Sequence, residues 1–133
     1  MEERTIQIIA GSTTVATAKL YDEACRLTAE AIWNALPLRF ANLLHSRFAG
    51  EEVYFPIRRI EGVPAENRKL ECVPGEISFF GPSSICIYYG KVNILSPGNV
   101  FAKVVTNWEN LYRICRLTWY DHNIPIRMER IEG

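Results

Sequence analysis

The 133-residue sequence has no surplus of charge of either sign, because 15 Lys and Arg residues balance 15 Asp and Glu residues. A surface that neutralises a phosphate backbone carries more basic than acidic residues. The sequence also lacks a Gly-rich phosphate loop. We therefore expect no nucleic-acid partner.

Long apolar runs are missing as well. The stretch over residues 1–11 begins with acidic residues, and its apolar run is too short for a signal peptide or a membrane span. We therefore expect a cytoplasmic protein that makes no contact with a membrane.

Metal-binding residue types are few and widely spaced. The four cysteines, Cys25, Cys72, Cys86 and Cys115, form no C-x-x-C pair, and the chain has only two histidines. A zinc site needs closely spaced ligands of these types. The pattern therefore predicts free, mostly buried thiols, and we expect neither a metal nor a cofactor.

What the chain does have is a repeated alternation of apolar and polar residues, which is typical of β-strands. Its length and its 48% hydrophobic content suit one globular domain over residues 1–133. The alternation predicts eight or nine short strands. They cover residues 5–10, 13–20, 38–48, 51–57, 76–80, 85–89 and 100–105, with 117–121 and 124–131 closing the chain.

Two stretches have helical periodicity instead. The first covers residues 22–37, with Asp22 as the expected N-cap and Pro37 as the stop, and its apolar stripe runs from Ala24 to Ala35. Its predicted stripe is Ala24, Leu27, Thr28, Ala31, Ile32 and Ala35. The second is shorter and covers residues 107–115.

This second helix is predicted to begin with Asn107 as its N-cap and to carry an apolar stripe of Trp108, Leu111, Tyr112 and Cys115. Residues 58–73 are charged and contain Gly and Pro, which predicts a long surface loop with its exposed tip near residues 65–69.

The number of predicted strands indicates a mainly β fold. Because closure removes exposed sheet edges, we expect a closed eight-stranded antiparallel barrel with two short helices that cap its ends.

The order of these elements resembles the cyclophilin fold, and within it small prokaryotic cyclophilin-like families of unknown function. The matching pieces are residues 22–37, 50–56, 74–80, 85–90 and 101–105. Prolyl isomerases of this fold carry a Phe-His-Arg strand, and a Trp and a His before their F-x-K-V strand. Here residues 92–99 read VNILSPGN, and neither Arg47 nor Arg58 follows Phe-His. The resemblance therefore implies a cyclophilin-like protein without the usual isomerase residues.

The hairpin over residues 75–91, GEISFFGPSSICIYYGK, has aromatic residues on both faces of its strands. One face serves the core, and the aromatic residues on the other face need a cover. Aromatic walls with a few polar groups suit a cleft for a small molecule or a short peptide. The predicted ligand-binding residues are His45, Arg47, Glu52, Tyr54, Phe80 and Tyr88.

Three alternatives stay open at this point. The cleft could belong to a metabolic enzyme that acts on a small polar substrate, or to a residual peptidyl-prolyl isomerase. The aromatic face could instead be the subunit interface of a homo-oligomer. No catalytic triad is visible, and Glu51 and Glu52 do not form a carboxylate pair, since neighbours on a strand point to opposite faces.

Overall fold

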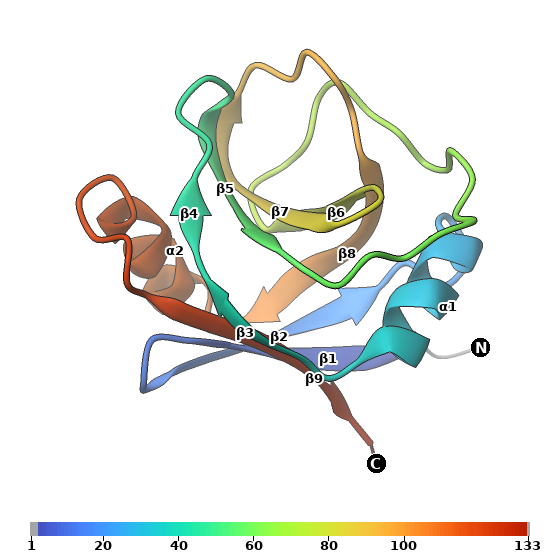
Figure 1. The fold of residues 1–133 in the computed structure, drawn as a ribbon, viewed down its shortest axis with the longest axis horizontal. Helices are drawn as coiled ribbons and strands as arrows, with labels where there is room; N and C mark the ends of the chain where they lie inside the picture. Colours follow the sequence, from blue (N-terminus) through green and yellow to red (C-terminus); the bar gives the residue numbers. More distant parts are fainter. Residues whose placement is uncertain (1–2, 133) are drawn as a thin grey trace.

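The structure is a computed structural model that describes residues 3–132. In these residues, nine strands form one antiparallel sheet that curves into a nearly closed barrel, with two helices on opposite sides of it (Figure 1). The strands are β1 (Thr5–Ala10), β2 (Thr14–Leu20), β3 (Leu38–Asn42), β4 (Leu44–His45), β5 (Gly50–Pro56), β6 (Glu76–Phe80), β7 (Ser84–Val92), β8 (Asn99–Thr106) and β9 (Pro125–Ile131). The helices are α1 (Arg26–Ala35) and α2 (Trp108–Leu117).

The sheet has two edges, β3 and β4, because its order is β3-β9-β1-β2-β8-β6-β7-β5-β4. Only Leu43 separates these two edge strands along the chain. The chain changes partner there: β3 pairs with β9, whereas β4 pairs with β5. The prediction of one strand over residues 38–48 is therefore wrong. The barrel has nine strands rather than eight, and it is not fully closed.

The predicted mainly β character is confirmed, and burial alternates along β1, β2 and the first part of β9, whereas β6, β7 and β8 are buried on both faces over most of their length. In β6 and β7 the predicted inward residues do belong to the core. The core of these two strands consists of Ile77, Phe79, Ile85, Ile87 and Tyr89. The prediction of a strand over residues 117–121 is wrong. These residues end α2 and continue as a turn, which is held by backbone hydrogen bonds such as Tyr120 N–H to Leu117 O (3.0 Å).

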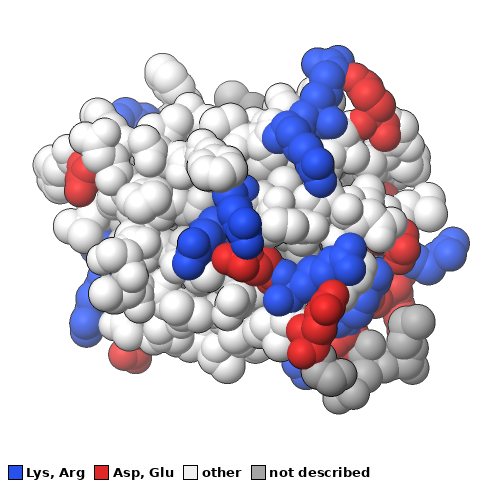
Figure 2. All heavy atoms as spheres, turned by 60° about the horizontal axis from the view of Figure 1, so that its bottom comes forward, with Lys and Arg blue, Asp and Glu red and all other residues white. Residues whose placement is uncertain are grey.

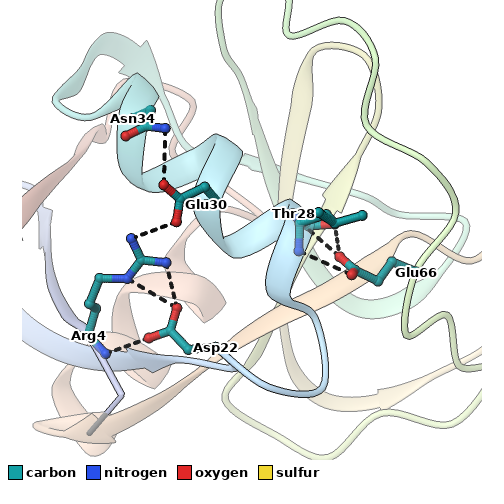
Figure 3. Close-up of polar contacts among 7 residues, drawn as sticks. Arg4, Asp22, Thr28, Glu30, Asn34 and Glu66 are labelled. Atoms are coloured by element: carbon teal, nitrogen blue, oxygen red, sulfur yellow. Dashed lines mark hydrogen bonds and ion pairs between the residues drawn. The ribbon is translucent and has the colours of Figure 1, made fainter. Parts of the chain in front are cut away.

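The start of α1 differs from the prediction. Asp22 does not cap it, because its carboxylate pairs with Arg4 (2.7 Å) instead. The cap comes from the distant loop: the Glu66 carboxylate accepts hydrogen bonds from the backbone N–H groups of Leu27 (3.1 Å) and Thr28 (2.8 Å) (Figure 3). A carboxylate at this position satisfies free N–H groups and opposes the positive end of the helix dipole.

The buried stripe of α1 is rotated from the predicted one. Ala24 and Leu27 are exposed, whereas Cys25 and Ala29 are fully buried. The core residues in or next to this helix are Cys25, Ala29, Ile32 and Ala35.

The segment between β5 and β6 has no regular structure beyond one isolated bridge, as predicted for a long loop, but residues 65–69 are not its free tip. The side chain of Asn99 accepts hydrogen bonds from the Glu66 backbone N–H (3.1 Å) and the Arg68 side chain (2.9 Å). Asn67 donates to the carbonyl of Val100 (2.8 Å). These contacts fix the loop against β8.

The second helix, α2, presents the predicted stripe. Leu111 and Cys115 are fully buried, and Trp108 and Tyr112 pack half-buried against the core. Asn107 stands before the helix without a side-chain capping bond, and its amide donates to the carbonyl of Val15 instead (2.8 Å).

All four cysteines are free, which confirms the prediction of unpaired thiols. Basic and acidic side chains lie next to each other on the face that Figure 2 shows. In the sheet, Arg39 of β3 and Arg127 of β9 both pair with Glu129 at 3.2 Å. Within residues 3–132, no helix combines the length and the apolar character that a membrane crossing requires.

Candidate functional site

The outer face of β5, β7 and β6 carries the candidate site. The antiparallel register places Glu52 opposite Tyr88, and Tyr54 opposite Cys86. Cys86 in turn lies opposite Ser78 of β6. Because side chains alternate along a strand, these residues stand on the face that does not point into the barrel.

A cavity of about 510 Å³ lies on this face. The strands form its floor, and its walls are the β4–β5 connection and the segment that follows β7. The backbone N–H of Asn93 donates to the carbonyl of Ala49 (2.8 Å), which joins the two walls. The lining residues are His45, Ser46, Arg47, Phe48, Ala49, Glu52, Tyr54, Phe80, Ser84, Cys86, Tyr88, Asn93, Ile94, Leu95 and Ser96.

All six residues predicted for ligand binding are among these lining residues. Their convergence comes from the register of β5 and β7 and from the turn that carries Arg47. Whether a ligand occupies the cavity stays a prediction.

The carboxyl group of Glu52 has the most unusual environment in the cavity. Its residue is only 9% exposed, and no ion pair joins it to any other described residue. Burial raises the pKa of Glu52, and hydrogen bonds with the side chains of Ser46 and Cys86 offset part of that rise. The site therefore holds a buried carboxyl group that has no cation as partner among the described residues.

Tyr88 and Cys86 form the buried part of the floor. The Tyr88 hydroxyl is hydrogen-bonded to the Ser78 hydroxyl (2.8 Å), which fixes the orientation of the ring. Burial raises the pKa of the Cys86 thiol to about 12, and the nearby Glu52 adds to the rise. Cys86 therefore stays a protonated thiol near neutral pH and is a poor nucleophile.

His45 and Arg47 line the cavity, but their polar groups bind elsewhere. The Nε2 atom of His45 is hydrogen-bonded to the Tyr89 hydroxyl (2.6 Å), and its ring packs on Trp119 with centroids 3.8 Å apart. Arg47 donates to the Trp119 carbonyl (2.6 Å) and lies 5.0 Å from the centroid of the same indole. His45, Arg47 and Glu52 thus line the same cavity, but none of the three forms an ion pair or a hydrogen bond with another.

The His45 ring retains one unsatisfied atom. Its Nδ1 is buried and has no hydrogen-bond partner. Burial lowers the pKa of His45, and the nearby Arg47 lowers it further, so the ring is neutral at pH 7.

Sequence reasoning missed several parts of the site. Trp119 follows α2, far along the chain from His45 and Arg47, and no local pattern indicates that it packs on them. Sequence reasoning also missed the rim of the cavity, which consists of Phe48 and Leu95; Phe48 is 97% exposed and Leu95 is 85% exposed. The one available signal for this rim was apolar residues next to turn residues: Phe48 comes just before Ala49-Gly50, and Ile94-Leu95 comes just before Ser96-Pro97-Gly98.

Residues 3–132 contain no group of three or more His, Cys, Asp or Glu side chains that could hold a metal ion. The polar side chains that line the cavity are one carboxyl group, one thiol, one imidazole, one guanidinium, one amide and several hydroxyl groups.

Comparison with known proteins gives a family and a fold. A family model described as "Protein of unknown function (DUF3830)" matches residues 8–129. No curated protein matches the sequence. The structure of McbB in complex with tryptophan is similar, with a TM-score of 0.81 at 20% identity, over 96% of this chain and 45% of that one. The chain thus spans less than half the length of McbB.

A second similar structure is the solution structure of the hypothetical protein AF2241 from Archaeoglobus fulgidus. Its TM-score is 0.68 at 23% identity, over 97% of this chain and 95% of that one. At such identities the likeness shows the fold alone. Neither description names a cyclophilin, so the resemblance to cyclophilins stays a prediction.

Proposed function

The chain belongs to the DUF3830 family of proteins of unknown function, and we propose that it binds a small molecule in the cavity on the outer face of β5, β7 and β6. One observation carries the proposal: a buried carboxyl group without a cation stands among aromatic side chains in a cavity of about 510 Å³. Ligand sites have this size and this mixture of apolar walls and few polar groups.

The first ligands to test are chosen from the aromatic residues that line the cavity and from one protein of similar structure. Tyr54, Phe80 and Tyr88 offer aromatic surface on which a ring can pack. McbB was solved in complex with tryptophan. Aromatic amino acids and their relatives therefore belong in the first set of test ligands, beside short peptides.

The test is a fragment screen by two-dimensional NMR of the labelled protein, with a cavity-blocking variant. Ser84 lines the cavity from a half-buried position, so Ser84→Trp fills the space from its side. Ser83 is also half-buried but does not line the cavity, so Ser83→Trp is the matched control.

We expect fragments that shift the amide signals of Glu52, Tyr54 and Tyr88 in the wild type and in Ser83→Trp, and that lose this effect in Ser84→Trp. A screen without hits on these residues, or hits that Ser84→Trp leaves unchanged, would contradict the proposal.

A second candidate function is catalysis on a small polar substrate in the same cavity. Its support is Glu52, because a buried carboxyl group with a raised pKa suits general acid–base chemistry. Turnover of a bound fragment that Glu52→Gln abolishes, with binding of that fragment retained, would favour it. A proline-peptide assay, with Arg47→Ala as the variant, tests residual isomerase activity separately.

A further inference from the structure

The described residues contain three buried acidic side chains, and two of them have a cation as partner. Asp22 pairs with Arg4 at 2.7 Å, and Glu76 pairs with Lys69 at 2.6 Å. Glu52 is the exception, since it has no such partner within residues 3–132. It is also the one of the three that lines the cavity.

A buried carboxylate without a cation is unfavourable, because burial removes its hydration and nothing of opposite charge replaces it. A cationic ligand group would supply the missing partner. We propose that the cavity binds an organic amine, whose ammonium group pairs with Glu52 and whose apolar part packs on the aromatic walls. This inference rests on the proposed function.

The walls favour a cation over an anion. The faces of Tyr54, Tyr88 and Phe80 carry the negative part of the ring quadrupole, which attracts an ammonium group. The one Arg of the lining is Arg47, and its guanidinium is engaged by the carbonyl and ring of Trp119. A carboxylate ligand would therefore meet Glu52 without a free Arg to offset the repulsion.

The rim suggests where the apolar part of the amine lies. Phe48 and Leu95 are almost fully exposed, although both line the cavity. An aromatic or branched apolar group that reaches the mouth would cover them, and this burial would add to the affinity. The two residues stand on the two walls that the Asn93–Ala49 hydrogen bond joins.

The test compares three probes of similar size: phenethylamine, phenethyl alcohol and phenylpropionate. Their binding is measured by titration calorimetry at low salt and about pH 8, where the amine is charged and carboxylates are ionised. We expect phenethylamine to bind at least about tenfold more tightly than the alcohol, as a charge-assisted hydrogen bond provides. We expect phenylpropionate to bind more weakly than either.

The matched variants are Glu52→Gln and Glu51→Gln. Glu51 is the neighbour on the same strand, but it does not line the cavity, and its carboxylate accepts the backbone N–H of Lys91 (2.9 Å). Glu52→Gln should remove the preference for the amine over the alcohol. Glu51→Gln should retain it.

Two results would overturn the inference and leave the proposed function standing. In the first, phenethyl alcohol or phenylpropionate binds as tightly as phenethylamine. In the second, Glu52→Gln leaves the affinity for phenethylamine unchanged. In both cases Ser84→Trp still blocks binding, which shows that the probes bind in the cavity. If none of the three probes binds at millimolar concentration and the fragment screen finds no ligand, both the inference and the proposed function are overturned.

Discussion

Glu52 of β5 lies directly opposite Tyr88 of β7, and both side chains are almost fully buried although they stand on the outer face of the barrel. Outward-facing side chains of a barrel usually reach solvent. Here the connections around the cavity cover them, so a second buried layer lies outside the main core. That layer contains the carboxyl group without a cation, which makes it a weak point for stability.

The first prediction concerns the loss of stability that an ionised Glu52 causes. Because the pKa of Glu52 is raised in the folded state, the folded chain holds the proton more tightly than the unfolded chain does. The stabilisation from this group is fully present below the ordinary value of 4.5, and it is lost as the pH rises through the raised pKa. Glu52→Gln stays neutral and should therefore become more stable than the wild type as the pH rises.

The measurement is urea unfolding, followed by tryptophan fluorescence, over a pH series from acidic to mildly basic. Glu51→Gln is the control, and the difference between it and the wild type should not grow in the same way. If the advantage of Glu52→Gln is constant with pH, or if the variant is less stable throughout, the carboxyl group is not destabilising when charged.

Much of this face could be predicted because it depends on local alternation. Glu52 and Tyr54 are two residues apart on one strand, as are Cys86 and Tyr88, so each pair shares a face whatever the partner strand is. The same rule places Ile77 and Phe79 together on the inward face of β6, and Ile85 and Ile87 together on the inward face of β7.

Contacts between distant segments could not be predicted in this way. The Arg47–Trp119 contact joins residues 72 positions apart, and the Glu66 cap of α1 joins residues 38 positions apart. Local rules instead favoured Asp22 as the cap, because an acidic residue before a helix usually serves there. The division of residues 38–48 into β3 and β4 at Leu43 could not be predicted for the same reason. It depends on β9 pairing with β3 and on β5 pairing with β4, which are distant in the sequence or set by the overall fold.

The second prediction concerns the cap of α1. Glu66→Ala removes the acceptor of the Leu27 and Thr28 backbone N–H groups and of the Thr28 hydroxyl. The loss should cost about 1–2 kcal/mol of unfolding free energy. Glu71→Ala, at an exposed position of the same loop, is the control. Equal stabilities of the two variants would mean that the cap contributes nothing.

The third prediction concerns Phe40, whose backbone has φ +69° and whose side chain is fully exposed. This left-handed conformation costs an ordinary residue about 1–2 kcal/mol, whereas Asn tolerates it. Phe40→Asn should therefore raise the thermal midpoint. Phe48→Asn is the matched control, because Phe48 is equally exposed but is not among the described residues with positive φ. A Phe40→Asn protein less stable than Phe48→Asn would contradict this.

The last prediction concerns His45 and acid. Burial, and then the charge of Arg47, lower the pKa of His45 in the folded state below the ordinary 6.5. Stability from the neutral ring is therefore present above 6.5 and is lost as the pH falls through the lowered pKa, because the unfolded chain takes up the proton first. His45→Gln should lose less stability than the wild type as the pH falls from neutral.

At neutral pH the same variant should be less stable than the wild type by about 1 kcal/mol, because the ring contact with Trp119 is gone. His122→Gln, at an exposed position, is the control and should keep the wild-type loss in acid. Urea unfolding at neutral and mildly acidic pH measures both effects. If His45→Gln and His122→Gln lose the same stability over this range, protonation of His45 does not contribute to unfolding in acid.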